Sequence, residues 1–351
     1  MSNIESNYLD DSDFLTSSDE DIGFISSDEN DNILINSILE KKFSSFIKLI
    51  ENNKCLKEKA YDNLVGKELD PLQISLKSYQ DYNDIHYITK LVETNYYDLN
   101  KSILYSIFNN DCYSYFKHIS KNMYKYTDDN NDNILIWASR FSNLKVVYDI
   151  YDNIKNIMHS NNQGINCFLS SANNLESKNM FEIVNFFLDK NINFINTFDN
   201  NKDNFLMILE NNSSIKLNDN NKSIIVKLIY DNGININHQN SLGKNILMVL
   251  IENCNYLDWK YLYDYVYFYI KNQIDLDTKD KENRDIIQYC INNVINQIKI
   301  MNKKSIKLLA NEFIKFKKSF NLIIENKDNF TSESKKQMKM FKSVLLKNKI
   351  V

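Results

Sequence analysis

Apolar residues recur along this chain in short blocks, and each block follows two Asn or Asp residues set five positions apart. In residues 240–250 the two polar residues are Asn240 and Asn245, and the apolar run Ile-Leu-Met-Val-Leu comes directly after them. The same pairs stand at Asp128 and Asn133, Asn161 and Asn166, Asp199 and Asn204, and Asp280 and Asp285. Asn and Asp side chains cap helix starts, so the pattern predicts a helix after each pair.

The second apolar residue of each block gives a register mark for an internal repeat. The clearest marks are Leu135, Phe168, Leu206, Leu247 and Ile287, and weaker ones lie upstream at Leu34, Leu72 and Leu104. Consecutive marks are 31 to 41 residues apart, which is the period of a repeated helix pair. A single pair of this size cannot bury its own apolar face, so neighbouring pairs are expected to stack and share one core.

A second apolar block with helical spacing completes each unit, as in residues 182–188, 225–230 and 265–270. Polar and apolar residues then alternate over 191–196, 233–237 and 273–277, which predicts an extended segment. Gly233 or Asn191 is suited to close the preceding helix in a left-handed conformation.

The segment 256–270 is rich in aromatic residues, and its tyrosines alternate as they would in a strand. The repeat frame nevertheless assigns it to a helix, with Val266 and Phe268 opposite Val226 and Leu228. Its aromatic side chains cannot all be buried in one helix. Two interpretations remain open for them: core packing, or a surface that binds a partner.

At this point the residues resemble the ankyrin repeat family. Its opening pattern Asp-x-x-Gly-x-Thr-Pro-Leu-His-x-Ala is similar to Asn240-Ser-Leu-Gly-Lys-Asn-Ile-Leu-Met-Val-Leu, and its ending Val-x-x-Leu-Leu-x-x-Gly-Ala-Asp-Val-Asn is similar to residues 228–237. The resemblance spans about residues 31–300. Asn or Asp replaces the Thr, and Pro occurs only at Pro71. Because the usual Thr and His are missing, a looser stack is expected, with Asn supplying the caps.

The resemblance implies an all-α, ankyrin-like helical solenoid with short hairpin-like loops. The domains expected are an acidic disordered tail at 1–30, seven to eight repeats at 31–298 and a Lys-rich helical cap at 299–351. It also implies a protein-binding surface made by the variable loop residues, which are Asp129, Asn130, Asp132, Asn162, Gln163, Ile165, Asn200, Asn201, Asp203, Ser241, Leu242, Lys244, Lys281, Glu282 and Arg284.

Composition changes how this pattern is interpreted. The chain of 351 residues has 56 Asn and only five Gly and one Pro, and its 42 basic residues include just two Arg. These are the preferences of a low-GC genome, so the Asn runs are not taken as a binding signal. The style resembles ankyrin proteins of large DNA viruses of protists.

Charge is divided between the two ends. Residues 1–31 hold ten acids and no base, and Ser17, Ser18 and Ser26 have the spacing of acidophilic kinase sites. Residues 299–351 hold fourteen Lys against four acids. A helix is expected over 303–320 as the closing element, followed by one carrying Met338, Phe341 and Leu345. The basic end suggests an alternative function, a tether to nucleic acid or to an anionic membrane surface.

Sequence motifs for catalysis are absent. The four His and five Cys are scattered without metal-ligand spacing, and no phosphate-binding glycine loop or nucleophile motif occurs. The sequence predicts no enzyme, cofactor or metal site. Scattered Cys and the lack of a signal peptide or membrane span indicate an intracellular, cytoplasmic protein. The leading hypothesis is a monomeric scaffold or adaptor that binds a protein partner.

Overall fold

The structure is a computed structural model of the whole chain. It describes residues 24–25, 32–51, 55–80, 84–118, 122–174, 176–190, 192–211, 225, 228–255, 257–300, 303–327 and 332–348. The chain divides into two compact units, Met1–Tyr97 and Asp98–Val351. The sequence predicts no boundary at that point, and the boundaries expected after residues 30 and 298 stay predictions.

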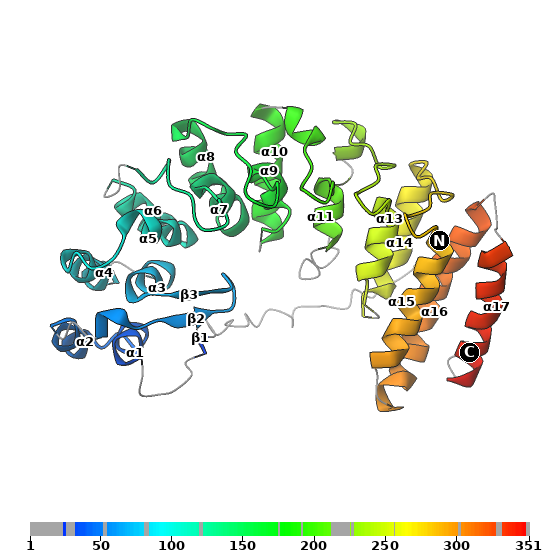
Figure 1. Cartoon of the computed structure of the whole chain (residues 1–351), viewed down its shortest axis with the longest axis horizontal. Helices are drawn as coiled ribbons and strands as arrows, with labels where there is room; N and C mark the ends of the chain where they lie inside the picture. Colours follow the sequence, from blue (N-terminus) through cyan, green and yellow to red (C-terminus); the bar gives the residue numbers. More distant parts are fainter. Residues whose placement is uncertain are drawn as a thin grey trace, which may run out of the picture. The chain divides into compact units, whose positions relative to one another are not determined.

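The described residues of the first unit form helices and one small sheet (Figure 1). Its helices are α1 (Ile33–Leu39), α2 (Phe43–Ile50), η1 (Cys55–Lys57), α3 (Pro71–Lys77) and α4 (Asp84–Glu93). Helix α3 begins at Asp70, whose carboxylate accepts from the Gln73 amide at 2.9 Å while the Gln73 side chain accepts from the Asp70 amide at 3.0 Å. This reciprocal cap, with Pro71 in the first turn, confirms the helix start expected ahead of Leu72.

The sheet corrects the prediction of an all-α chain. Strands β1 (Phe24–Ile25), β2 (Ala60–Asp62) and β3 (Lys67–Leu69) are antiparallel in that order. Strand β1 falls inside the segment expected to be a disordered tail, and the rest of 1–31 lies outside the described residues. Asp62 accepts from the Val65 amide at 3.0 Å and pairs with half-buried Lys77 at 2.5 Å. Three-residue strands carry too little alternation to be recognised from sequence.

The second unit contains a row of inner helices in which each packs on the next (Figure 1). They are η2 (Ile103–Phe108), α7 (Ile134–Phe141), α9 (Cys167–Ser171), α11 (Phe205–Asn211), α13 (Ile246–Asn253) and α15 (Ile286–Ile300). The predicted register marks lie on these helices and on α1 and α3, and none is more than 1% exposed. An inner helix touches a neighbour on both sides, which explains why whole apolar runs are buried.

The other helices of the second unit pack beside this row. They are α5 (Leu99–Ser102), α6 (Asn110–Phe116), α8 (Leu144–Asn153), α10 (Ser177–Lys190), η3 (Ile192–Asn196), α14 (Trp259–Lys271), α16 (Lys303–Asn326) and α17 (Ser332–Lys347). Helix α6 contacts α8, α8 contacts α10, and α14 contacts α16, while α17 packs on α15. The expected closing helices are therefore present, with Phe313, Phe316, Phe320, Phe341 and Leu345 buried.

The residues after the second helix of each repeat differ from the extended segments that alternation predicts. Residues 192–196 form the 3₁₀ helix η3, and 236–237 and 276–277 are turns. Alternation there reflects a tight turn whose apolar members, such as Phe194 and Ile236, are buried. Gly233 does take the expected left-handed conformation, at φ +67°, and Gln273 takes it at φ +62°. Asn191 lies outside the described residues.

Candidate interaction surfaces

Five repeats of the second unit, those whose inner helices are α7, α9, α11, α13 and α15, begin with a five-residue tip that is fixed by its first side chain. At the tip 240–244, Asn240 Oδ1 accepts from the amides of Leu242 and Lys244, both at 3.0 Å. The Asn240 amide donates to the Lys244 carbonyl at 3.0 Å, and the Gly243 amide donates to the Asn240 carbonyl at 2.9 Å. The short side chain of Asn240 thereby accepts from two backbone amides that have no backbone acceptor within the turn.

The same hydrogen bonds hold all five tips, which begin at Asp128, Asn161, Asp199, Asn240 and Asp280. The fourth residue of every tip has a positive φ, between +60° and +79°, at Asn131, Gly164, Lys202, Gly243 and Asn283. The residue directly after each tip caps the inner helix through its side chain. These caps are Asn133, Asn166, Asn204, Asn245 and Asp285. The pairs that define the repeat in sequence are thus its turn-forming and capping residues.

Consecutive tips are joined directly through their backbones. The second residue of one tip donates its amide to the carbonyl of the third residue of the tip before it, over 2.7 to 3.0 Å. The four bonds run from Asn162 to Asn130, Asn200 to Gln163, Ser241 to Asn201 and Lys281 to Leu242. Two histidines add to this row, because His159 and His238 contact the carbonyls of Asn131 and Lys202 at 2.7 and 2.6 Å. The tips therefore form one continuous row.

The structure brings the predicted partner-binding residues together along this row, but it exposes only part of them. Nine are exposed, namely Asp129, Asn130, Asn162, Gln163, Asn200, Asn201, Leu242, Lys281 and Glu282, and Ile165, Ser241 and Arg284 are half-buried.

The remaining three, Asp132, Asp203 and Lys244, are buried, which corrects their assignment to a surface. Asp132 Oδ1 accepts from Asn161 Nδ2 at 2.7 Å, and Asp203 Oδ1 accepts from Asn240 Nδ2 at 2.8 Å. Lys244 pairs with Glu252. Burial raises the pKa of Asp203, although the bond from Asn240 opposes that shift. Asp132 and Asp203, each the fifth residue of its tip, thus link neighbouring repeats.

Gly164 lies in close contact with the next tip. At φ +78°, a Cβ there would lie 2.8 Å from the Asn200 amide nitrogen, whereas a Cβ on Gly233, at φ +67°, would meet nothing within 4 Å. Gly164→Ala is expected to lower the free energy of unfolding by about 3 kcal/mol, and Gly233→Ala by about 1 kcal/mol, since only the first adds a backbone clash to the left-handed strain. Urea unfolding of both variants measures the difference; equal losses would contradict it.

Helix α14 carries the aromatic residues that the sequence left between two interpretations, and the structure buries some of them and exposes others. Trp259, Tyr265 and Tyr269 are buried, whereas Tyr263 and Tyr267 are exposed and stack with their ring centroids 6.4 Å apart.

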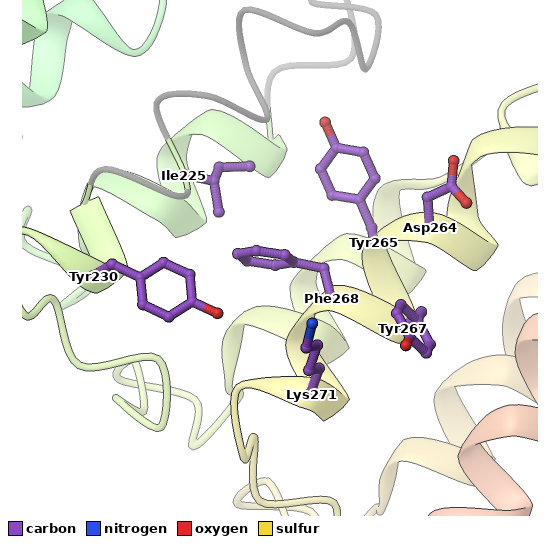
Figure 2. A pocket seen from close by; sticks show the side chains of 7 residues that line it. All are labelled: Ile225, Tyr230, Asp264, Tyr265, Tyr267, Phe268 and Lys271. Carbon is purple, nitrogen blue, oxygen red and sulfur yellow. The ribbon is translucent and has the colours of Figure 1, made fainter.

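Beside these rings lies a pocket of about 290 Å³ lined by Ile225, Tyr230, Asp264, Tyr265, Tyr267, Phe268 and Lys271. Figure 2 shows the Phe268 ring between Tyr230 and Tyr265, with the Lys271 amine beside it. The pocket offers an apolar recess close to one cation.

The basic C-terminal helices are anchored to the last tip region by two buried polar side chains. Lys327 Nζ donates to the Leu276 carbonyl at 2.6 Å and pairs with Asp277 at 2.7 Å, and Ser334 Oγ donates to Asp285 at 2.5 Å. Other lysines of α16 and α17 are exposed, at Lys315, Lys317, Lys318, Lys335, Lys336, Lys339, Lys342 and Lys347. The basic charge therefore lies on the solvent side of a packed cap.

Two buried asparagines that the sequence analysis missed tie successive inner helices together. Asn174 Nδ2 donates to the carbonyls of Ser139 and Ser142 at 2.9 and 2.8 Å, which end α7. Asn293 Nδ2 donates to the carbonyls of Ile251 and Cys254 at 2.8 and 2.7 Å, which end α13. Each stands six residues after a register mark, and that spacing was the available signal.

Within the described residues, no three His, Cys, Asp or Glu side chains gather as they would around a metal ion. No helix in the same part of the chain has the length and apolar character needed to cross a membrane.

Comparison with known proteins finds no matching family model and no matching curated protein. Among solved structures, the chain is similar to an ankyrin repeat domain from Acinetobacter baumannii AYE, with 15% identity, 65% of this chain and 96% of that chain covered, and a TM-score of 0.44. It is also similar to a structure of the Bd0816 predatory endopeptidase from Bdellovibrio bacteriovorus in complex with immunity protein Bd3460, with 18% identity, 54% and 89% coverage, and a TM-score of 0.40.

Proposed function

We propose that this protein is a non-catalytic interaction scaffold, an ankyrin-type helical solenoid that works inside a cell and binds a protein partner along its row of tips. The observation that carries the proposal is the set of nine exposed tip side chains on a backbone that is hydrogen-bonded from one tip to the next. A surface held in place before binding loses little conformational entropy when a partner docks.

The third residue of each tip provides the sharpest test. Its backbone carbonyl joins the tips, but its side chain points outward, so the side chain can be changed without removing the linking bond. In the full-length chain, Asn130, Gln163, Asn201, Leu242 and Glu282 are all replaced by Ala. The control changes exposed residues of the outer helices, Lys145→Ala, Asp152→Ala and Lys178→Ala.

We expect the tip variant to keep the helical circular dichroism of the wild type and to lose at least about tenfold in partner affinity, because tip residues would form the interface. Affinity capture from the native cell identifies the partner, and titration of the purified pair measures the loss. The control should bind as the wild type does. A tip variant that binds with full affinity rejects the tips as the interface.

A further inference from the structure

A cluster of three aromatic rings on two neighbouring outer helices surrounds a lysine ammonium. Lys190 Nζ, at the end of α10, lies 5.7 Å from the ring centroid of Tyr148, 5.9 Å from that of Tyr151 and 5.6 Å from that of Phe186. Tyr148 and Tyr151 come from α8 and Phe186 from α10. Within the described part of the chain, Lys190 makes no ion pair. The rings therefore hold a cation by their faces alone.

The rings support one another and remain accessible. The Phe186 centroid is 5.1 Å from that of Tyr151, at 80°, and 5.6 Å from that of Tyr148, at 53°. Tyr148 is 50% exposed, and Lys190 is exposed as well. An edge-to-face cluster of this kind presents negative ring faces to a cation without needing a carboxylate. The rings face solvent, and only the side chain of Lys190 covers them.

A second cluster occupies matching positions of a later repeat but lacks one of the three rings. Tyr230 stands ten residues before Asn240, as Tyr151 stands ten before Asn161, and its ring meets Phe268 edge to face at 6.5 Å, at 83°. Lys271 lies beside that pair in the pocket of Figure 2. The position matching Tyr148 is Lys227 in the sequence, so this second cluster has no third ring from that position.

We propose that Tyr148, Tyr151 and Phe186 form a binding site for the methylated ammonium group of a lysine side chain in a protein partner. Lys190 occupies this site when no partner is bound. The ammonium of Lys190 lies over all three rings, which shows that the cluster can accept the cation of a lysine-type side chain. Methylation favours the ligand over Lys190, because a trimethylated ammonium is weakly hydrated and has no N–H to satisfy, whereas Lys190 Nζ makes no hydrogen bond within the described residues. This surface is separate from the tips, so the proposal stands or falls independently of them.

The test uses the full-length chain labelled with ¹³C in its aromatic rings and follows ring chemical shifts by NMR. The probe is Nε-trimethyllysine with blocked termini, compared with unmodified blocked lysine, with the neutral isostere 3,3-dimethylbutanol and with phosphocholine. Lys190→Ala is expected to bind the trimethyllysine probe about tenfold more tightly than the wild type, because it removes an internal competitor and a repelling charge. Lys190→Met, which refills the site with an uncharged chain, and Lys178→Ala, which removes a charge elsewhere on α10, should not tighten binding.

Adding Tyr148→Ala to Lys190→Ala is expected to abolish binding, and Tyr148→Phe should keep it; the exposed position of Tyr148 makes both variants compatible with folding. Equal binding of 3,3-dimethylbutanol would show an ordinary apolar surface and overturn the proposal. Phosphocholine binding as tightly as trimethyllysine would overturn the assignment to lysine. Failure of Lys190→Ala to bind trimethyllysine at millimolar concentration would overturn the site itself.

Discussion

Replacing Asn293 with leucine is expected to lower the free energy of unfolding by about 4 kcal/mol, because it leaves three buried polar groups without partners. Asn293 is 4% exposed. Its Nδ2 donates to the carbonyls of Ile251 and Cys254, and its Oδ1 accepts from Trp259 Nε1 at 3.1 Å. Leucine matches the size of asparagine but forms none of these bonds. A single side chain thus connects α13, α14 and α15.

The neighbouring residue supplies a matched control for this change. Asn292 lies on the same helix and is exposed, so Asn292→Leu should change stability by less than about 0.5 kcal/mol. Urea unfolding followed by tryptophan fluorescence measures both variants, because Trp259 at the site and Trp137 on α7 are both buried. If the two variants unfold at the same urea concentration, Asn293 does not have the structural role described for it.

A rise in pH from 5 to 9 is expected to destabilise the second unit through one buried carboxyl group. Glu210, on α11, is 8% exposed, and burial raises its pKa to about 8 from an ordinary value of 4.5. The Tyr269 hydroxyl donates to Glu210 Oε1 at 3.4 Å, which opposes the shift only in part. The folded protein therefore keeps this carboxyl protonated at neutral pH.

The direction of the effect follows from where the proton is held. Below pH 4.5 the carboxyl is protonated in the folded and unfolded states, and its contribution to stability is fully present. Between pH 4.5 and 8 the unfolded chain releases the proton while the folded state retains it, so stability falls as pH rises, by on the order of 4 kcal/mol in all. Above pH 8 the loss is complete.

The variant Glu210→Gln isolates this contribution, because the amide is neutral at every pH and still accepts from Tyr269. It should match the wild type at pH 5 and exceed its stability at pH 9 by the amount the wild type has lost. Glu182→Gln, on the outer helix α10, should instead follow the wild type throughout. Urea midpoints measured across this range give the comparison; parallel curves for wild type and Glu210→Gln would reject the buried acid as the cause.

The sequence predicted the repeat of the second unit well because its polar residues have local roles. Asn240 fixes its turn and Asn245 caps its helix through bonds to residues at most four positions away. Such short-range chemistry appears as fixed spacing in the chain. The buried register marks are predictable for the same reason, since each lies at a constant distance from the cap.

The features that the sequence did not predict depend on contacts between distant residues. Asp132 and Asp203 are of a residue type that is usually exposed. They can be buried because the side-chain amide of an Asn in the next repeat donates to each of them. The role of Asn293 depends on carbonyls about forty residues upstream in the chain. The aromatic cluster around Lys190 joins rings from two helices, α8 and α10, that are separated in the sequence by another helix. Partners that far apart cannot be found from local periodicity alone.

The backbone bonds between tips have a consequence for how such a surface can evolve. The link from Ser241 to Asn201, or from Lys281 to Leu242, uses an amide and a carbonyl that every residue except proline supplies in full. Mutations at these positions can therefore alter what the protein recognises while leaving its folding energy nearly unchanged. Selection for a new partner is then free to act on the exposed side chains independently of selection for stability.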